Sequence, residues 1–172
     1  DEAAILPDLV RRLSGLDYPV DRLEGFLLLE SHDHRTRRAA EALDLPDWLR
    51  VVVVPVGTPQ TKPRALNYGL SMATGDLVTI YDAEDEPHPL QLRRAAETFA
   101  ADCSSRIACV QAPLRIRRAG DGRSETPFMD RQFAVEYAAL FEVTLPALSR
   151  LGMPFPLGGT SNHFRRSALE QV

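Results

Sequence analysis

Short apolar runs alternate with amphipathic segments of helical spacing along nearly the whole chain, and this alternation limits the possible folds more than any other feature. The clearest strand is the run of four valines at 51–54, because β-branched side chains favour extended backbone. Alternation of this kind predicts an α/β fold with a largely parallel sheet flanked by helices, in a single domain over residues 1–172. Strands are predicted at 26–29, 51–54, 77–81 and 107–111; helices are predicted at 1–16, 34–43, 63–73, 89–101, 128–148 and from Asn162 onward.

Carboxylates crowd the end of the predicted strand 77–81. The sequence Asp82-Ala83-Glu84-Asp85-Glu86 follows directly and is closed by Pro87. Such carboxylates repel one another unless a cation neutralises them, and ligands bind at this end of the strands in an open α/β sheet. The pattern fits a divalent metal that carries a phosphorylated substrate, and it fits equally well a solvated acidic turn. For Asp85 alone, capping of the next helix is the favoured interpretation.

Three further polar segments are expected at the same edge of the sheet. Glu30-Ser31-His32-Asp33 follows a strand, and Thr61 to Asn67 contains Lys62, the only lysine of the chain. Gly158 to Arg166 combines a glycine pair with Asn162 and Arg165, which we expect at a helix start that favours anionic groups. Each has a structural alternative: Asp33 as the N-cap of the next helix, Asn67 in a hydrogen bond within the core, and Arg165 with Arg166 on a solvated face. His32, His34, His88 and His163 lack ligand spacing and are taken as structural or solvated residues.

Charge and apolar pattern exclude some classes of function. A net charge of −4 argues against a nucleic-acid partner, for which a basic face is expected. No uninterrupted apolar segment reaches the length of a membrane span. Cys103 and Cys109 show no metal-ligand spacing, which favours reduced thiols in a cytoplasmic compartment. The apolar stripe of Phe133, Tyr137, Leu140 and Phe141 predicts a helix face that packs in a core.

The motifs taken in order resemble one known family over nearly the whole chain. The order is Lys62…Asn67, then Gly75-Asp76…Tyr81-Asp82-Ala83-Glu84…Pro87, then Gln111-Ala112-Pro113, then Gly159-Thr160…Asn162…Phe164-Arg165-Arg166. It resembles the processive family 2 glycosyltransferases, the GT-A-fold enzymes that include cellulose synthase-like membrane proteins. The resemblance implies a GT-A fold with a Rossmann-like sheet, a UDP-sugar donor, and Mg²⁺ or Mn²⁺ as the cofactor.

The same resemblance assigns roles to individual residues. Asp82 would contact the ribose or the metal and Glu84 would coordinate the metal, with glutamate in place of the second aspartate of the family's Asp-x-Asp element. Glu30 or Asp33 would read the uracil and ribose, and Lys62 would lie near the diphosphate or the uracil. The turn with Gly159 and Thr160, together with Asn162, would approach the sugar or the acceptor.

Family 2 enzymes invert the anomeric carbon by direct displacement, which needs a carboxylate base. In the resembling family this base lies in a Thr-Glu-Asp element downstream of the Gly-Thr-x-Asn segment, and no residue of this chain matches it. We therefore expect a donor-binding fragment, truncated at both ends, that binds UDP-sugar weakly if at all and does not catalyse transfer. The whole protein is expected on the cytoplasmic side of a membrane, held there by other segments, and to extend a polysaccharide or another glycan.

Two alternatives remain open. The first is a catalytically silent nucleotide-sugar-binding module. The second is a sugar-nucleotide nucleotidylyltransferase, which would need a glycine-rich loop before the first helix, and no such loop is visible in the sequence.

Overall fold

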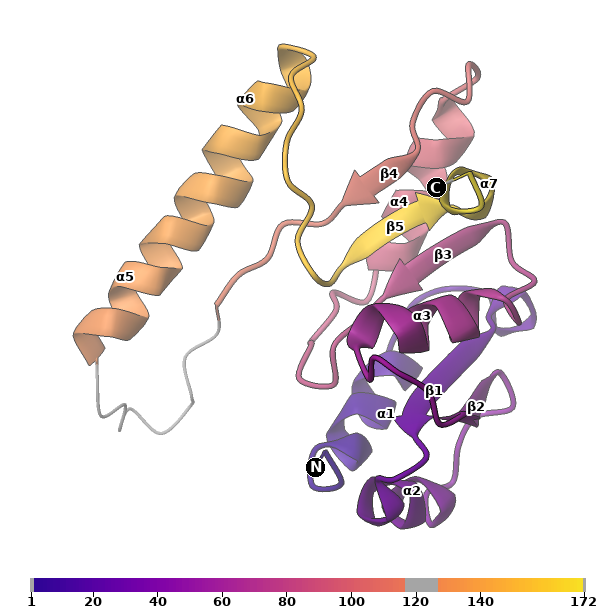
Figure 1. Cartoon of the computed structure of the whole chain (residues 1–172). Coiled ribbons are helices and arrows are strands. Elements are labelled where there is room, and N and C mark those ends of the chain that lie inside the picture. Colours follow the sequence, from indigo (N-terminus) through magenta and orange to yellow (C-terminus); the bar gives the residue numbers. More distant parts are fainter. Residues whose placement is uncertain (1, 117–126, 172) are drawn as a thin grey trace. The chain divides into compact units, whose positions relative to one another are not determined.

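The computed structural model describes residues 2–116 and 127–171 and confirms the predicted alternation of strands and helices (Figure 1). The chain forms two compact units, residues 1–110 with 163–172 and residues 111–162, and each is described by itself. The prediction of a single domain stays a prediction. The elements, in chain order, are α1 (Leu6–Ser14), η1 (Val20–Arg22), β1 (Gly25–Glu30), α2 (His34–Glu41), β2 (Leu49–Val54), α3 (Lys62–Leu70), β3 (Leu77–Ile80), α4 (Gln91–Ala101), β4 (Cys109–Gln111), α5 (Pro127–Ala138), η2 (Ala139–Thr144), α6 (Leu145–Arg150), β5 (Asn162–Arg165) and α7 (Arg166–Leu169).

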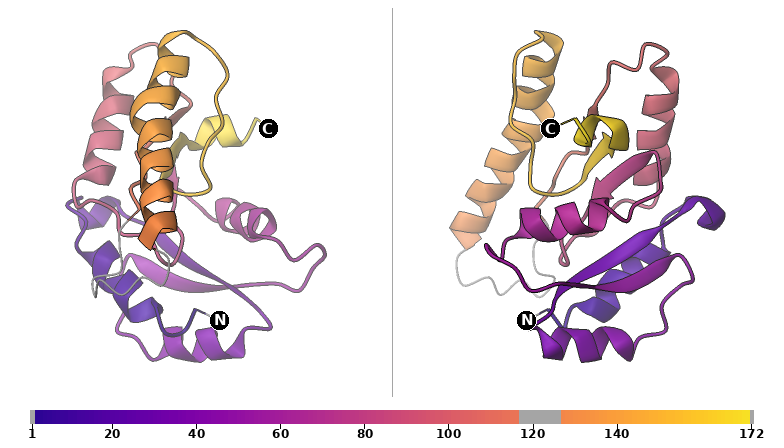
Figure 2. Two further views of the ribbon diagram at one scale, coloured as in Figure 1. Left: turned by 90° about the vertical axis from the view of Figure 1, so that its left-hand side faces the viewer. Right: turned by 45° about the vertical axis from the view of Figure 1, so that its right-hand side comes forward.

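Strands β1 and β2 pair in parallel, with Leu27 opposite Val51 and Glu30 opposite Val54. Successive side chains of a strand point to opposite faces, so the leucines of β1 pack against two different helices. Leu27 and Leu29 are buried in a core cluster with α1, whereas Leu28 faces α3, where a Cβ added at Gly69 would lie 2.9 Å from Leu28 Cδ1. Accordingly, α1 and α3 lie on opposite sides of these strands (Figure 2).

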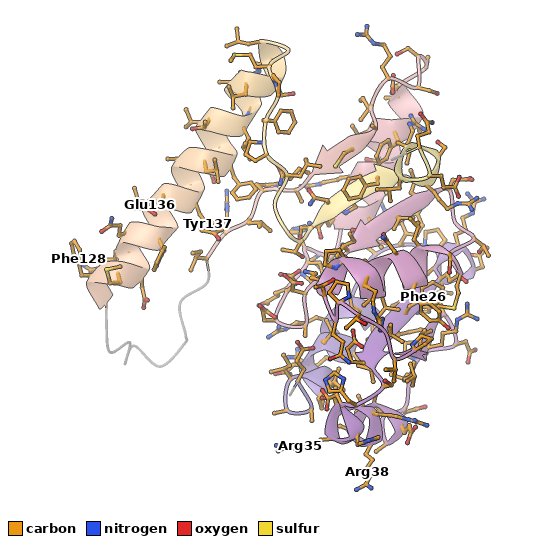
Figure 3. The ribbon with its side chains drawn as sticks, in the orientation of Figure 1. Phe26, Arg35, Arg38, Phe128, Glu136 and Tyr137 are labelled. Carbon is orange, nitrogen blue, oxygen red and sulfur yellow. The ribbon has the colours of Figure 1, made fainter. Side chains whose placement is uncertain are left out.

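The main core of the first unit forms between α1, β1, α2 and the start of β2. Helix α2 shows how the helical period separates its two sides: Thr36 and Ala40 are buried, whereas Arg35 and Arg38 extend outward (Figure 3). Tyr81 and Ala83, which flank Asp82, pack against the same cluster. The core therefore also supports the acidic segment after β3. Its buried members are Leu6, Leu9, Val10, Leu13, Leu27, Leu29, Ala40 and Leu49.

Strand β5 lies between β3 and β4 in a three-stranded sheet. This corrects the prediction of a helix from Asn162, because residues 162–165 are extended and the helix begins only at Arg166. Arg165 has φ −70° and ψ 126°, which is extended backbone. The polar composition of Asn162 to Arg166 suggested an exposed helix start. The strand is instead a central one, and Asn162 and His163 are both buried, at 3% exposure.

The second unit contains a continuous helical stretch, α5 followed by the π-helical turns of η2 and by α6. The predicted core stripe is wrong for three of its four residues: Phe141 is buried, whereas Phe133, Tyr137 and Leu140 are exposed. Figure 3 shows Phe128 and Tyr137 projecting from α5. The charged, glycine-containing sequence of residues 115–127 predicts a loop or hairpin, and this segment falls largely outside the described residues. Over the described ranges, no helix combines the length and apolarity that crossing a membrane requires.

Candidate functional site

The acidic segment after β3 forms a tight turn that is closed by its own polar groups. The Asp82 amide donates to Asp85 Oδ2 at 2.7 Å, and the Asp85 amide donates to the Asp82 carbonyl oxygen at 3.0 Å. The prediction that Asp85 caps the following helix is therefore wrong, since the residue before α4 is Leu90 and Asp85 caps the turn instead. We call residues 82–85 the acidic turn.

Lys62 and Asp82 come together as an ion pair between Lys62 Nζ and Asp82 Oδ1. Lys62 is the first residue of α3, with Pro63 in the first turn, where proline's missing amide costs nothing. The side chains are 47% and 33% exposed, so the pair is accessible to a ligand. The sequence predicted both residues for one site, and the structure places them in direct contact.

Glu84 differs from its neighbours in the acidic turn. Its side chain is exposed, and in the described part of the chain its carboxylate makes no hydrogen bond or ion pair. An available carboxylate two residues from Asp82 suits a hard divalent cation such as Mg²⁺ or Mn²⁺, which prefers oxygen ligands. Among the described residues no cluster of three or more His, Cys, Asp or Glu is arranged to hold a metal.

A second basic residue of α3, Arg64, lies near the end of β1. Arg64 Nη2 is 3.8 Å from Glu30 Oε2, and the same nitrogen donates to the carbonyl oxygen of Pro55. A Cβ added at Gly57 would lie 3.1 Å from Arg64 Nε, so glycine lets the loop after β2 approach the guanidinium group. Glu30 Oε2 is buried and has no hydrogen-bond partner among the described residues. Glu30 Oε2 therefore has an ion-pair partner in Arg64 but accepts no hydrogen bond from the described residues.

Asp33 behaves as the structural alternative predicted. It is the N-cap of α2, and its Oδ1 accepts a hydrogen bond from the Thr36 amide at 3.0 Å. Hydrogen bonding to Thr36 lowers the pKa of this carboxyl group. Glu30 and Asp33 line one hollow of about 190 Å³ at the end of β1. Its lining residues are Glu2, Leu28, Leu29, Glu30, His32, Asp33 and Thr36.

The glycine turn of the second unit, residues 158–162, is closed by a hydrogen bond from Asn162 Nδ2 to the Gly158 carbonyl oxygen. A Cβ added at Gly158 would lie 3.1 Å from Gln111 Nε2, whereas one added at Gly159 would meet nothing within 4 Å. Thr160 and Ser161 are buried, and Ser161 has a φ of 56°, which is strained for a residue with a side chain. Asn162 Oδ1 is also buried without a partner among the described residues.

Arg165 is a structural brace, which neither prediction for it anticipated. Its Nε donates to the Ile107 carbonyl oxygen at 2.9 Å and its Nη2 to that of Phe99 at 3.1 Å. Its Nη2 also lies 3.4 Å from Asp102 Oδ2, and its guanidinium carbon lies 4.9 Å from the centre of the Phe99 ring. Arg165 Nε and Nη2 are thus both directed at protein groups.

The structure reveals one contact to the acidic turn that no pattern in the sequence indicates. Arg12 of α1 donates through Nη1 to the carbonyl oxygens of Glu84 at 3.1 Å and Asp85 at 3.2 Å. The partners are more than 70 residues apart in sequence, and an arginine in an amphipathic helix has many ordinary explanations. Only the tertiary structure could identify it.

An α/β fold with a parallel strand pair, flanking helices and carboxylates at a strand end defines a protein of the GT-A type. The mannosyltransferase PcManGT of Pyrobaculum calidifontis, solved with GDP-Man and Mn²⁺, matches this fold with a TM-score of 0.64 and 24% identity. The match covers 98% of this chain and 43% of that chain. The chain belongs to the family described as "Glycosyltransferase like family 2", whose model matches residues 1–172.

Two relatives are similar to this chain in sequence over somewhat more than half of its length. The chain is 33% identical to the β-monoglucosyldiacylglycerol synthase of Synechocystis sp. over 103 residues, which is 59% of this chain and 21% of that protein. It is 27% identical to the probable glycosyltransferase YdaM of Bacillus subtilis over 92 residues, which is 52% of this chain and 22% of that protein. The matched segments thus span about a fifth of either relative.

Proposed function

We propose that these residues form the donor-binding part of a glycosyltransferase, and that they bind a UDP-sugar through a divalent cation. The observation that carries the proposal is the pairing of Lys62 with Asp82 beside the unpaired carboxylate of Glu84, in a chain of this family. This arrangement offers oxygen ligands for a metal and an ammonium group for a phosphate within a few ångströms of each other. Bound there, Mg²⁺ or Mn²⁺ would neutralise the charge that develops on the leaving diphosphate.

Glu30 is our candidate for recognising the uracil of the donor by a hydrogen bond, and Asp33 supports this role indirectly. A buried acceptor oxygen without a hydrogen-bond partner is costly, and a uracil N–H would satisfy Glu30 Oε2. One carboxylate oxygen of Asp33 already accepts a hydrogen bond from the Thr36 amide, so the main role of Asp33 in this proposal is to fix the start of α2. Gly159, Thr160 and Asn162 are proposed to approach the sugar or the acceptor. We assign the general base to no residue of this chain.

The acceptor is proposed to be a growing polysaccharide or another glycan, on the motif order that resembles the cellulose synthase-like enzymes. In this proposal the whole protein acts at the cytoplasmic face of a membrane. The name of the Synechocystis relative makes a diacylglycerol lipid the competing acceptor. Assays of the whole protein with glycan and lipid acceptors, with the chain length of the product as the readout, would separate the two.

Calorimetric titration of the 172-residue chain with UDP tests donor binding. We expect binding in the presence of Mn²⁺ and its loss on addition of a chelator. Asp82→Asn and Glu84→Gln should each abolish the dependence on Mn²⁺, whereas Glu86→Gln, a matched loss of one carboxylate nearby, should retain it. Tighter binding of GDP would revise the donor. Absence of binding to any nucleoside diphosphate would overturn the proposal.

A further inference from the structure

Helix α1 and the turn after it contact the segment from Asp82 to Pro89 at two places. Arg12 of α1 donates to the carbonyl oxygens of Glu84 and Asp85, and the Asp17 amide, just beyond α1, donates to the Pro89 carbonyl oxygen at 2.8 Å. Arg93 Nη2 and Asp17 Oδ1 form an ion pair of 2.7 Å, which connects the same region to α4. The segment is therefore attached both in the acidic turn and at Pro89 to an amphipathic helix and the turn that follows it.

The contacts of the acidic turn divide its groups by function. The carbonyl oxygens of Glu84 and Asp85 accept from Arg12, and the Asp85 carboxylate accepts from the Asp82 amide. Backbone and Asp85 groups are thus used to fix the shape of the turn, whereas the Glu84 carboxylate stays exposed. A guanidinium group directed at carbonyl oxygens stabilises a backbone shape without pairing with the carboxylates beside it.

We infer that Arg12 is a positioning residue, which holds the backbone of the acidic turn so that the carboxylates of Asp82 and Glu84 are arranged for a divalent cation. This inference rests on the proposed function. Groups that orient metal ligands commonly change metal affinity when they are removed, although they never touch the metal. Arg12 is partly buried and comes from an element whose other face lies in the core, so its position is well fixed.

The direction in which the affinity for the cation changes when Arg12 is replaced distinguishes a positioning role from a simple effect of charge. Removing a positive charge near a cation site raises the affinity for the cation by Coulomb's law. Removing a positioning residue lowers it. Arg11, the preceding residue, supplies a matched control because it is exposed, pairs with Asp8 at 2.8 Å, and has its pKa raised by Asp8 and, to a lesser degree, by Glu86. It carries the same charge at the neighbouring position of α1 but donates to neither carbonyl oxygen of the turn.

The experiment compares Arg12→Gln with Arg11→Gln in the 172-residue chain. Titration with Mn²⁺ alone should show a loss of affinity of roughly tenfold for Arg12→Gln and none for Arg11→Gln. Hydrogen exchange without metal gives a second readout, because the Asp82 and Asp85 amides that close the turn should exchange faster in Arg12→Gln only. Arg12→Lys, which keeps the charge without the planar group, should be intermediate, and it replaces Arg12→Gln if that variant does not fold.

The outcomes distinguish this inference from the proposed function. If the wild-type chain binds Mn²⁺ and Arg12→Gln binds it equally or more tightly, with unchanged exchange at both amides, the positioning role is refuted and the donor site stands. If the wild-type chain binds neither Mn²⁺ nor UDP, the proposed function fails, and with it the inference that depends on it.

Discussion

Replacing Arg165 by methionine should lower the free energy of unfolding substantially while leaving nucleotide binding intact. The change keeps the apolar stem and removes every donor of the guanidinium group. Two carbonyl oxygens, those of Ile107 and Phe99, then lose a charged donor, at about 1.5 kcal/mol each, the lower end of the range for hydrogen bonds to charged groups. Loss of the cation–π contact with the Phe99 ring adds about 0.5 kcal/mol. The expected total is about 3.5 kcal/mol.

Arg166→Met is the matched control. Arg166 is the next residue and pairs with Glu170 at 3.2 Å across one helical turn, with side chains that are 32% and 54% exposed. A pair of this kind contributes about 0.3 to 0.5 kcal/mol. Urea unfolding followed by circular dichroism should therefore show a large shift of the midpoint for Arg165→Met and almost none for Arg166→Met.

Nucleotide binding decides whether Arg165 braces the sheet or binds an anion. Measured in buffer where both variants are folded, the affinity for UDP with Mn²⁺ should equal that of the wild-type chain. An unchanged unfolding midpoint together with lost UDP binding would show that the guanidinium group contacts the ligand and that our reading of its contacts is wrong.

Three further predictions concern titratable groups. Lys62→Met should raise the affinity for Mn²⁺ alone by up to about fivefold in calorimetry, because it removes the exposed ion pair between Lys62 and Asp82. It should also weaken UDP binding. An affinity for Mn²⁺ equal to that of the wild-type chain would contradict competition between Lys62 and the metal for Asp82. Burial raises the pKa of Cys109 to about 11, so its alkylation at pH 8 should be about a hundredfold slower than that of an ordinary thiol. Mass spectrometry after iodoacetamide treatment measures this rate, with the exposed Cys103 as internal reference, and equal rates for the two cysteines would contradict the prediction. The Ile107 amide, the Ser104 hydroxyl and Arg165 lower the pKa of Asp102. The Asp102 carboxylate therefore contributes stability above the ordinary carboxyl pKa of about 4, and this contribution is lost as pH falls through the lowered pKa. The urea midpoint of Asp102→Asn should depend less on pH in this range than that of the wild-type chain, and an equal pH dependence of the two would refute the prediction.

The sequence predicted those parts of the fold whose signal is local. The valines of β2, the leucines of β1 and the amphipathic helices were recognisable because their residue pattern matches the period of the element they form. Residues 162–165 failed because their strand character depends on two neighbouring strands rather than on their own composition. The prediction that Phe133 and Tyr137 are buried was wrong, because an apolar stripe on a helix does not indicate which surface, if any, covers it.

The candidate site was partly predictable for a related reason. A run of carboxylates after a strand and a lone lysine at a helix start are visible in one dimension, and Lys62 and Asp82 indeed meet. Glu30 and Asp33 could not be distinguished by sequence, because only coordinates show that Asp33 Oδ1 accepts a hydrogen bond from the Thr36 amide, whereas Glu30 Oε2 accepts none from the described residues. Arg12 was not predictable at all, because its role depends on carbonyl oxygens, which every residue possesses.

Gly69 lets helix α3 pack closely on β1. No side chain separates this point of the helix from Leu28, and the opposite end of α3 carries the ammonium group that reaches Asp82. A methyl group at position 69 would lie 2.9 Å from Leu28 Cδ1, so the end of the leucine side chain would have to move to another rotamer. The close approach of α3 to the strand therefore depends on a residue that contacts neither member of the Lys62–Asp82 pair.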